Sequence, residues 1–326
     1  MSHAPVLLAE AIEALAPKDG ALYVDATFGG GGYTRALLEA AQCRVIAIDR
    51  DPAAIARARA LAQEFPGRVF PAQGRFSTLD TLAGEPVAGV VLDVGVSSFQ
   101  IDSPERGFSF RFDADLDMRM EQAGASAMDA LALLSQGGLE SALRDFGEEK
   151  QARRIAKAIV AARAKGPLRT TAQLAQLVET ALGGRKGARL HPATRTFRAL
   201  RLLVNDELSE LAQALNAAER ILLPGGRLVV VSFHSLEDRL VKQALAERGG
   251  ALGTGSRYRP EITAQAPSFR LLKRGAMEPS AAEQETNPRA RSARLRAAER
   301  TSAPAWGGVS APDLAAAALA EWSRIA

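Results

Sequence analysis

The chain has 326 residues, of which 47% are hydrophobic and 24% charged, with a formal net charge of +4. This composition is typical of a folded protein with a sizeable core and excludes a disordered one. The one cysteine, Cys43, excludes an internal disulfide, and no apolar run reaches the ~18 residues of a membrane span. Glu10 and Glu13 lie in an N-terminus without a basic start, so we predict no signal peptide and a cytoplasmic location.

The first hundred residues alternate between two patterns. Strand-like runs cover residues 21–27, 44–50, 68–73 and 87–96, and helix-like runs cover 34–42 and 52–65. Near-continuous apolar strands that alternate with helices predict a parallel sheet covered on both faces. We therefore expect an α/β fold.

The pattern changes after residue 97, where a polar, loop-like stretch runs to 128 and a helical region follows to about 200. A capping box, Thr170 to Gln173, opens one of these helices. After Pro192 a single long helix is predicted. Its apolar stripe is formed by Phe197, Leu200, Val204, Leu208, Leu211, Leu215, Ala218 and Leu222.

Strand-like runs return at 222–234 and 268–274. The early and late strands are expected to share one sheet, interrupted by a helical insertion. This predicts a discontinuous domain of residues 1–105 and 205–300, an inserted helical domain of residues 106–204, and a C-terminal extension of residues 301–326.

Residues 25–34, DATFGGGGYT, place a glycine loop between the first strand and the next helix. The dinucleotide fingerprint fails here, because Thr34 or Arg35 stands where the third glycine belongs, and no Lys-Ser/Thr follows for a P-loop. S-adenosylmethionine (SAM) fits better: the loop's N–H groups suit its carboxylate, Asp25 its ammonium, and Asp49, at the end of the second strand, its ribose. A tight turn that binds nothing is the alternative, but four glycines cost conformational entropy.

Two more polar side chains follow strands. Asp93 ends the fourth strand and His234 follows the strand RLVVVSF. Ligands of open α/β sheets lie beyond the carboxyl ends of the strands, so both side chains are expected near the site. A lone histidine is more often structural than functional, and that alternative stays open for His234.

Basic residues gather in two segments. Residues 185–201 hold Arg185, Lys186, Arg189, Arg195, Arg198 and Arg201 without an acid, and residues 289–300 hold five arginines and one acid, Glu299. Clustered arginines favour a nucleic-acid backbone, because each contact releases counterions. A solvated basic face is the alternative.

Long motifs now point to one family. YVDATFGGGGYT, AIDRDPAAI, GVSSFQIDSPERGFSF, HPATRTFRALRLLVNDEL, VSFHSLEDR and NPRARSARLR occur in order between about residues 3 and 300. The chain resembles the bacterial ribosomal RNA small-subunit methyltransferase H family (RsmH/MraW). The resemblance implies a class I SAM-dependent methyltransferase domain with an inserted helical domain. It further implies methylation of the exocyclic N4 amine of a decoding-centre cytosine in 16S rRNA.

The resemblance also implies site residues. The cofactor contacts carried over are Gly31, Gly32, Tyr33, Asp49, Phe76, Asp93 and Gln100. Tyr33 departs from the family, which usually has histidine there, so it is expected to bind and not to react. Arg289, Arg291, Arg294 and Arg296 are expected to contact RNA phosphates, and no metal is expected.

The chemistry needs an acceptor for a proton of the amine, and we hypothesise that His234 accepts or relays it while Asp93 holds SAM. Cys43 precedes the second strand, outside the expected site, which argues against methylation at carbon 5. Phe99, Phe108, Phe110 and Phe112 could stack on a flipped base or pack their loop onto the sheet.

The alternative functions are a methyltransferase of another RNA, a non-catalytic SAM- and RNA-binding protein, and a dinucleotide-dependent oxidoreductase. The oligomeric state stays open, a homodimer included.

Overall fold

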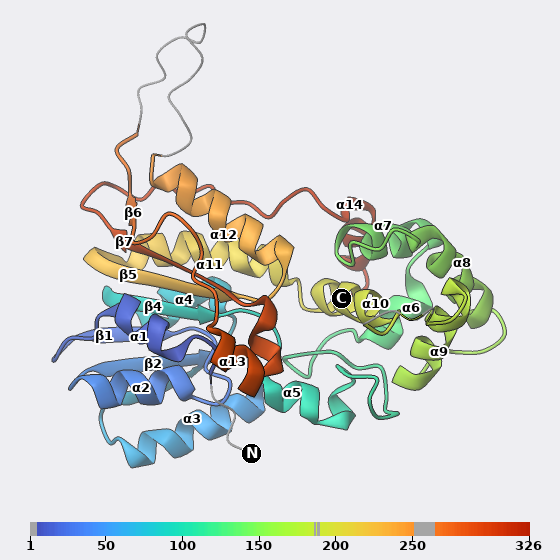
Figure 1. The fold of residues 1–326 in the computed structure, drawn as a ribbon, viewed down its shortest axis with the longest axis horizontal. Coiled ribbons are helices and arrows are strands. Elements are labelled where there is room, and N and C mark those ends of the chain that lie inside the picture. Colours follow the sequence, from blue (N-terminus) through green and yellow to red (C-terminus); the bar gives the residue numbers. More distant parts are fainter. Residues whose placement is uncertain (1–4, 186, 188–189, 251–264) are drawn as a thin grey trace, which may run out of the picture. The chain divides into compact units, whose positions relative to one another are not determined.

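The computed structural model describes residues 5–185, 187, 190–250 and 265–326. The chain divides into two compact units (Figure 1). The sheet unit comprises Met1–Gly95 and Leu208–Ala311, and the helical unit comprises Val96–Glu207 and Pro312–Ala326. The final residues are thus shared: 301–311 belong to the sheet unit and 312–326 to the helical one.

The sheet unit is built on seven strands in the order β3-β2-β1-β4-β5-β7-β6, within the described residues. Pairs among β1 to β5 are parallel, and β7 is antiparallel to both β5 and β6. The bounds are β1 Leu22–Asp25, β2 Arg44–Asp49, β3 Val69–Gln73, β4 Val87–Asp93, β5 Leu222–Ser232, β6 Phe269–Leu271 and β7 Arg294–Arg300. The predicted α/β fold and the single sheet of early and late strands are confirmed.

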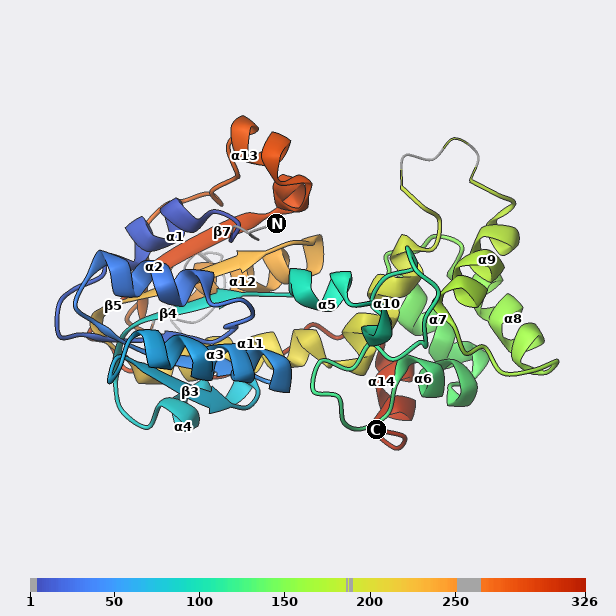
Figure 2. The same ribbon diagram turned by 90° about the horizontal axis from the view of Figure 1, so that it is seen from below.

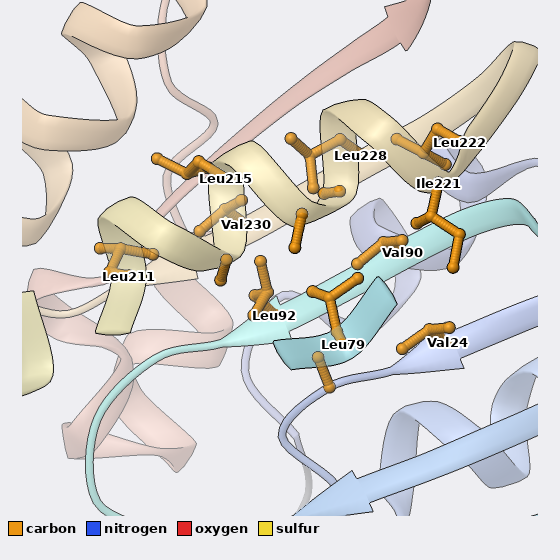
Figure 3. Packing of buried hydrophobic residues seen from close by; sticks show 14 of the residues in the cluster. Val24, Leu79, Val90, Leu92, Leu211, Leu215, Ile221, Leu222, Leu228 and Val230 are labelled. Carbon is orange, nitrogen blue, oxygen red and sulfur yellow. The ribbon is translucent and has the colours of Figure 1, made fainter. Parts of the chain in front are cut away.

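Helices cover both faces of this sheet, because the strands alternate buried side chains between two apolar clusters. In β4, Val90 and Leu92 pack with α11 and α4 (Figure 3), and Val91 joins the cluster of α1, α2 and α3. The helices are α1 Leu8–Leu15, α2 Gly32–Ala40, α3 Pro52–Glu64, η1 Phe76–Thr78, α4 Leu79–Ala83, α11 Glu207–Ile221, α12 Ser235–Arg248, α13 Ala281–Thr286 and η3 Pro288–Ser292.

The helical unit contains no strand longer than an isolated bridge in the part of it that the structure describes. Its helices are α5 Ser98–Asp102, η2 Pro104–Arg106, α6 Ala127–Leu133, α7 Gln136–Asp145, α8 Ala152–Arg163, α9 Thr171–Leu182, α10 Thr194–Val204 and α14 Ala316–Trp322. The predicted Thr170–Gln173 capping box opens α9. Figure 2 shows α7, α8 and α9 side by side. Across the described chain, no helix has the length and apolarity needed to cross a membrane.

The single long helix predicted after Pro192 is wrong: α10 ends at Val204 and α11 begins at Glu207. Asp206 lies between them with φ of 50°, a left-handed conformation that no helix continues. The buried Asn205 donates from Nδ2 to the Met118 carbonyl at 2.8 Å and accepts the Met120 N–H at 2.9 Å. The break therefore ties the polar loop before α6 to the helices.

Candidate functional site

The glycine loop joins β1 to α2, next to the point where the sheet order reverses between β1 and β4. Its backbone requires glycine. Gly31 precedes α2 with φ of 80°, and a Cβ there would lie 2.5 Å from Phe28 Cζ, while one on Gly32 would overlap Pro5 Cγ. The first N–H groups of α2 have no partner within the helix, so the loop presents donors beside the positive end of the helix dipole.

Asp49 ends β2 and holds this loop in place. Its Oδ2 accepts the Gly29 N–H at 2.8 Å and its Oδ1 accepts the Asp51 N–H at 2.8 Å. Burial raises the pKa of Asp49. Each carboxylate oxygen keeps a second lone pair, which leaves acceptor capacity for a ligand hydroxyl.

Two more acids lie at the ends of β1 and β4. Asp25 is fully buried and accepts from Thr34 Oγ1 at 2.7 Å, and burial raises its pKa to about 6. Asp93 donates its N–H to Thr27 Oγ1 at 2.6 Å. Burial, then the charges of Asp25 and Glu237, raise the pKa of Asp93 to about 8. The site is therefore short of positive charge.

The Asp93 carboxyl also has an unused acceptor. Its Oδ1 is buried and has no hydrogen-bond partner among the described residues. A buried polar atom without a partner is rare in folded proteins, because desolvation is not repaid. A cationic ligand with N–H donors, placed between β1 and β4, would supply both the partner and the missing charge.

His234 directly precedes α12 and acts as its N-cap. Its Nδ1 accepts the Glu237 N–H at 3.5 Å, and its Nε2 lies 2.9 Å from Glu237 Oε1. Glu237 in turn accepts the N–H groups of Phe233 and His234. Both ring nitrogens thus face Glu237, and these contacts give His234 a structural role; its catalytic role stays a prediction.

Tyr33 uses its side chain away from the loop. The buried hydroxyl donates to the carbonyl of Val6, and the next residue, Leu7, donates its N–H to Glu283 Oε1 at 2.8 Å. The tyrosine at this position therefore anchors the N-terminal segment against the glycine loop. No sequence signal indicated this contact, because its partner lies 27 residues away.

Phe76 and Gln100 lie in different units. Phe76 begins η1 after β3 and packs, half-buried, against the core of the sheet unit. Gln100 is a buried residue of α5 in the helical unit, where its Oε1 accepts the Ser97 N–H at 3.0 Å. Its N–H donates to Ser97 Oγ at 3.2 Å, which completes a capping box.

The arginines predicted to bind RNA are divided between η3 and β7. Arg289 and Arg291 lie in η3, and Arg291 is exposed. Arg294 and Arg296 lie in β7, a strand not predicted from the sequence, although Leu295 and Ala297 alternate with them and are buried. Arg296 forms a bidentate pair with Asp238 at 2.7 and 3.0 Å.

Acids also neutralise much of the earlier basic segment. The pairs are Arg185–Glu179 at 3.4 Å, Arg195–Glu149 at 3.9 Å, Arg198–Glu148 at 3.0 Å and Arg201–Glu207 at 2.7 Å. Lys186 and Arg189 lie outside the described residues. Acids outside residues 185–201 therefore pair with these four arginines, although the segment itself contains no acid.

The four phenylalanines after β4 have different environments within the helical unit. The guanidinium carbon of Arg106 lies over the Phe108 ring, 5.8 Å from its centroid. Phe110 packs against His191 and Phe197, with ring centroids 4.6 and 4.9 Å apart. Phe99 and Phe112 are 39% and 56% exposed. Packing therefore accounts for Phe110, whereas Phe99 and Phe112 keep surface available for stacking.

The sequence comparisons with known proteins point to one family. Residues 1–301 match the profile of the MraW methylase family. The chain is 59% identical over 308 residues to the ribosomal RNA small subunit methyltransferase H of Hyphomonas neptunium, covering 93% of this chain and 90% of that protein. The protein of the same name from Xanthobacter autotrophicus is 56% identical over 94% of this chain and 89% of its own length. A solved rRNA methylase from Streptococcus thermophilus has a TM-score of 0.40 and 12% identity, over 92% of this chain and 99% of that one.

Proposed function

The chain belongs to the MraW methylase family, and from this premise we propose that it methylates the N4 amine of a decoding-centre cytosine in 16S rRNA, using SAM. The observation that carries the proposal is the buried, unpartnered Oδ1 of Asp93 beside Asp25 at the sheet's switch point. Such a pair of acids fits the ammonium of an amino acid ligand. A nicotinamide dinucleotide has no ammonium group. The loop also lacks the third glycine of the dinucleotide-binding fingerprint.

The other parts of the site fit the remaining groups of SAM. The glycine loop and the start of α2 would hold its carboxylate, Asp49 its ribose hydroxyls, and Phe76 the adenine face. When bound, SAM supplies an electrophilic methyl group on a sulfonium. The residues of this chain bind and orient it, and they exclude water from the buried acids.

The amine of cytosine is a poor nucleophile, because its lone pair is delocalised into the ring. A protein acceptor must therefore take an N–H hydrogen bond and then a proton. Since both ring nitrogens of His234 face Glu237, a relay through the His234–Glu237 pair fits the geometry better than direct acceptance by the imidazole. Asp93 stays assigned to SAM.

We propose that the substrate is small-subunit RNA, as the names of the relatives suggest, and that the protein acts in the cytoplasm. The target base must leave its stack to reach the sheet edge. Of the predicted phosphate contacts, we keep Arg291 as the first choice, because it is exposed, whereas Arg296 is engaged by Asp238 and Arg294 lies 3.3 Å from Glu278. Exposed Phe99 and Phe112 are the aromatic candidates for stacking.

The test uses tritium-labelled SAM and three acceptors: small subunits from cells lacking the enzyme, naked ribosomal RNA, and DNA. The product is digested and the labelled nucleoside identified. Label in N4-methylcytidine from small subunits or their RNA supports the proposal. Normal SAM binding without label in any nucleic acid would favour a non-catalytic SAM-binding protein, and label in another nucleoside would favour another RNA substrate.

A further inference from the structure

Helix α8 has two chemically distinct faces. Ala152, Ile155, Ala156 and Ile159 are buried, and the helix packs on α7 and α9. On the other side, Arg153, Arg154 and Lys157 are exposed, and Lys150 is exposed just before the helix. Residues three and four apart lie next to one another on a helix, so these side chains form one basic strip. We call Lys150, Arg153, Arg154 and Lys157 the α8 strip.

No acid among the described residues forms a salt bridge with the α8 strip. Helix α8 itself contains no acid. Within the described part of the chain, the one hydrogen bond of these side chains runs from Arg154 Nη1 to Gln151 Oε1 at 3.5 Å. This differs from the arginines of residues 185–201, four of which pair with acids.

The acids nearby are committed elsewhere. Glu148 and Glu149, just before α8, face Arg198 and Arg195. On α7, Glu140 and Asp145 face Arg144. On α9, Glu179 faces Arg185 and His191. The charge of the strip therefore stays uncompensated by the elements packed around it.

The arrangement does not serve the stability of the helix. Two arginines in the first turn oppose the helix dipole, and like charges three and four residues apart repel. Arg163, at the other end of α8, shows the contrasting use: its Nη1 donates to the carbonyls of Leu131 and Leu134, both at 2.7 Å. Since no described residue pairs with the charge of the strip, an external anion would relieve the repulsion within it.

We infer that the α8 strip binds the phosphate backbone of the RNA substrate. The inference rests on the proposed function, which supplies a polyanion as partner. A membrane fits less well, because an interfacial helix needs an apolar face toward the lipid and that face of α8 is buried. Lysine and arginine that neutralise phosphates release counterions, so the strip predicts a salt-dependent contribution to binding.

The experiment measures binding of small-subunit RNA between 50 and 200 mM salt, for wild type and for Arg153→Gln/Arg154→Gln/Lys157→Gln. Three lost phosphate contacts should reduce the slope of log K against log salt by about 2 to 3. Over this range the wild type should therefore lose about 20- to 40-fold more affinity than the variant. The KM for RNA should rise, while kcat and the Kd for SAM stay unchanged.

The matched control, Arg44→Gln/Arg144→Gln/Arg220→Gln, removes the same charge from arginines that pair with Glu85, Asp145 and Asp80. Its slope should change by less than about 1. Equal slopes for both variants, or an unchanged slope for the α8 variant, would overturn the inference. So would unchanged RNA binding together with lost binding to anionic lipid vesicles. Because the experiment measures binding, it separates the two proposals. A wild type that binds RNA through the α8 strip but does not methylate it would refute the proposed function and leave this inference intact.

Discussion

Replacing Asp93 by asparagine tests the buried acids of the site. Burial raises the pKa of Asp93 from an ordinary 3.8 to about 8. At pH values between 3.8 and about 8, the carboxyl group of Asp93 is deprotonated in the unfolded chain but protonated in the native protein, so the native state binds more protons. Stability must then fall as pH rises, by about 1.4 kcal/mol per pH unit from this one group. Asparagine cannot ionise, so the variant loses this slope.

The expected result is a free energy of unfolding, variant minus wild type, that grows by about 2.5 kcal/mol between pH 5.5 and 7.5, because the slope begins to level off as pH nears the pKa of Asp93. The assay is urea unfolding followed by tryptophan fluorescence. Of the two tryptophans, Trp306 lies in the sheet unit and Trp322 in α14 of the helical unit. A Trp322→Phe background therefore leaves Trp306 to report on the unit that contains Asp93.

Asp80→Asn in the same background controls for the loss of one carboxylate, since Asp80 faces Arg220 at the surface of the same unit. A difference that stays constant with pH for Asp93→Asn, or that grows equally for both variants, would refute the reasoning. The stabilised variant should bind SAM more weakly, because it has lost the acid assigned to the ammonium. Isothermal titration calorimetry at pH 7.5 measures this loss.

Three further changes test separate contacts. Gly32→Ala should lower SAM affinity about tenfold, measured by calorimetry, because the new methyl group would displace Pro5 from the loop. Glu219→Ala should cost the sheet unit about 3–5 kcal/mol in urea unfolding, because it strands the buried guanidinium of Arg248, 2.9 Å away. His234→Asn keeps an N-cap acceptor but removes the imidazole, so kcat should fall with SAM binding intact.

Each of these changes has its own control. Gly166→Ala adds a methyl group where nothing lies within 4 Å, and it should leave the Kd for SAM unchanged. Glu64→Ala breaks an exposed pair with Arg35 and should cost less than about 1 kcal/mol. A His234→Asn enzyme with wild-type turnover would leave His234 as a helix cap only. A Glu219→Ala protein as stable as the Glu64→Ala protein would contradict the burial argument.

The fold could be predicted where strands are almost continuously apolar. β4 and β5 are buried on both faces, and their sequences indicate this directly. β7 was not predicted as a strand, because Arg294 and Arg296 alternate with its buried residues and resemble a phosphate-binding segment. What makes it a strand is distant: Arg296 finds Asp238, and β5 and β6 supply hydrogen bonds on both sides. The apolar stripe of α10 and α11 likewise continues across a break that only the φ of Asp206 reveals.

The candidate site likewise has residues whose place could be predicted from the sequence and residues whose role could not. Asp49 and Asp93 could be placed because the ends of parallel strands lie at one edge, a consequence of topology. The roles of Tyr33 and His234 could not be predicted, because they depend on which partner each side chain finds. Tyr33 reaches Val6, and His234 turns to Glu237 one helical turn further along its own helix. A residue type at a strand end thus predicts proximity to a ligand, but not which atoms remain free for it.

The antiparallel β7 also sets the order in which the sheet can be completed during synthesis. One edge of β5 pairs with β4, and its other edge pairs with β7. β7 ends at Arg300, 68 residues after β5 ends at Ser232. At about 5–20 residues per second, the ribosome needs roughly 3–14 s to make that stretch. Throughout this interval a long apolar strand has one edge unpaired, which is the state in which nascent chains aggregate. A chain terminated before Arg294 would retain the glycine loop and all three site acids, yet keep that edge open permanently.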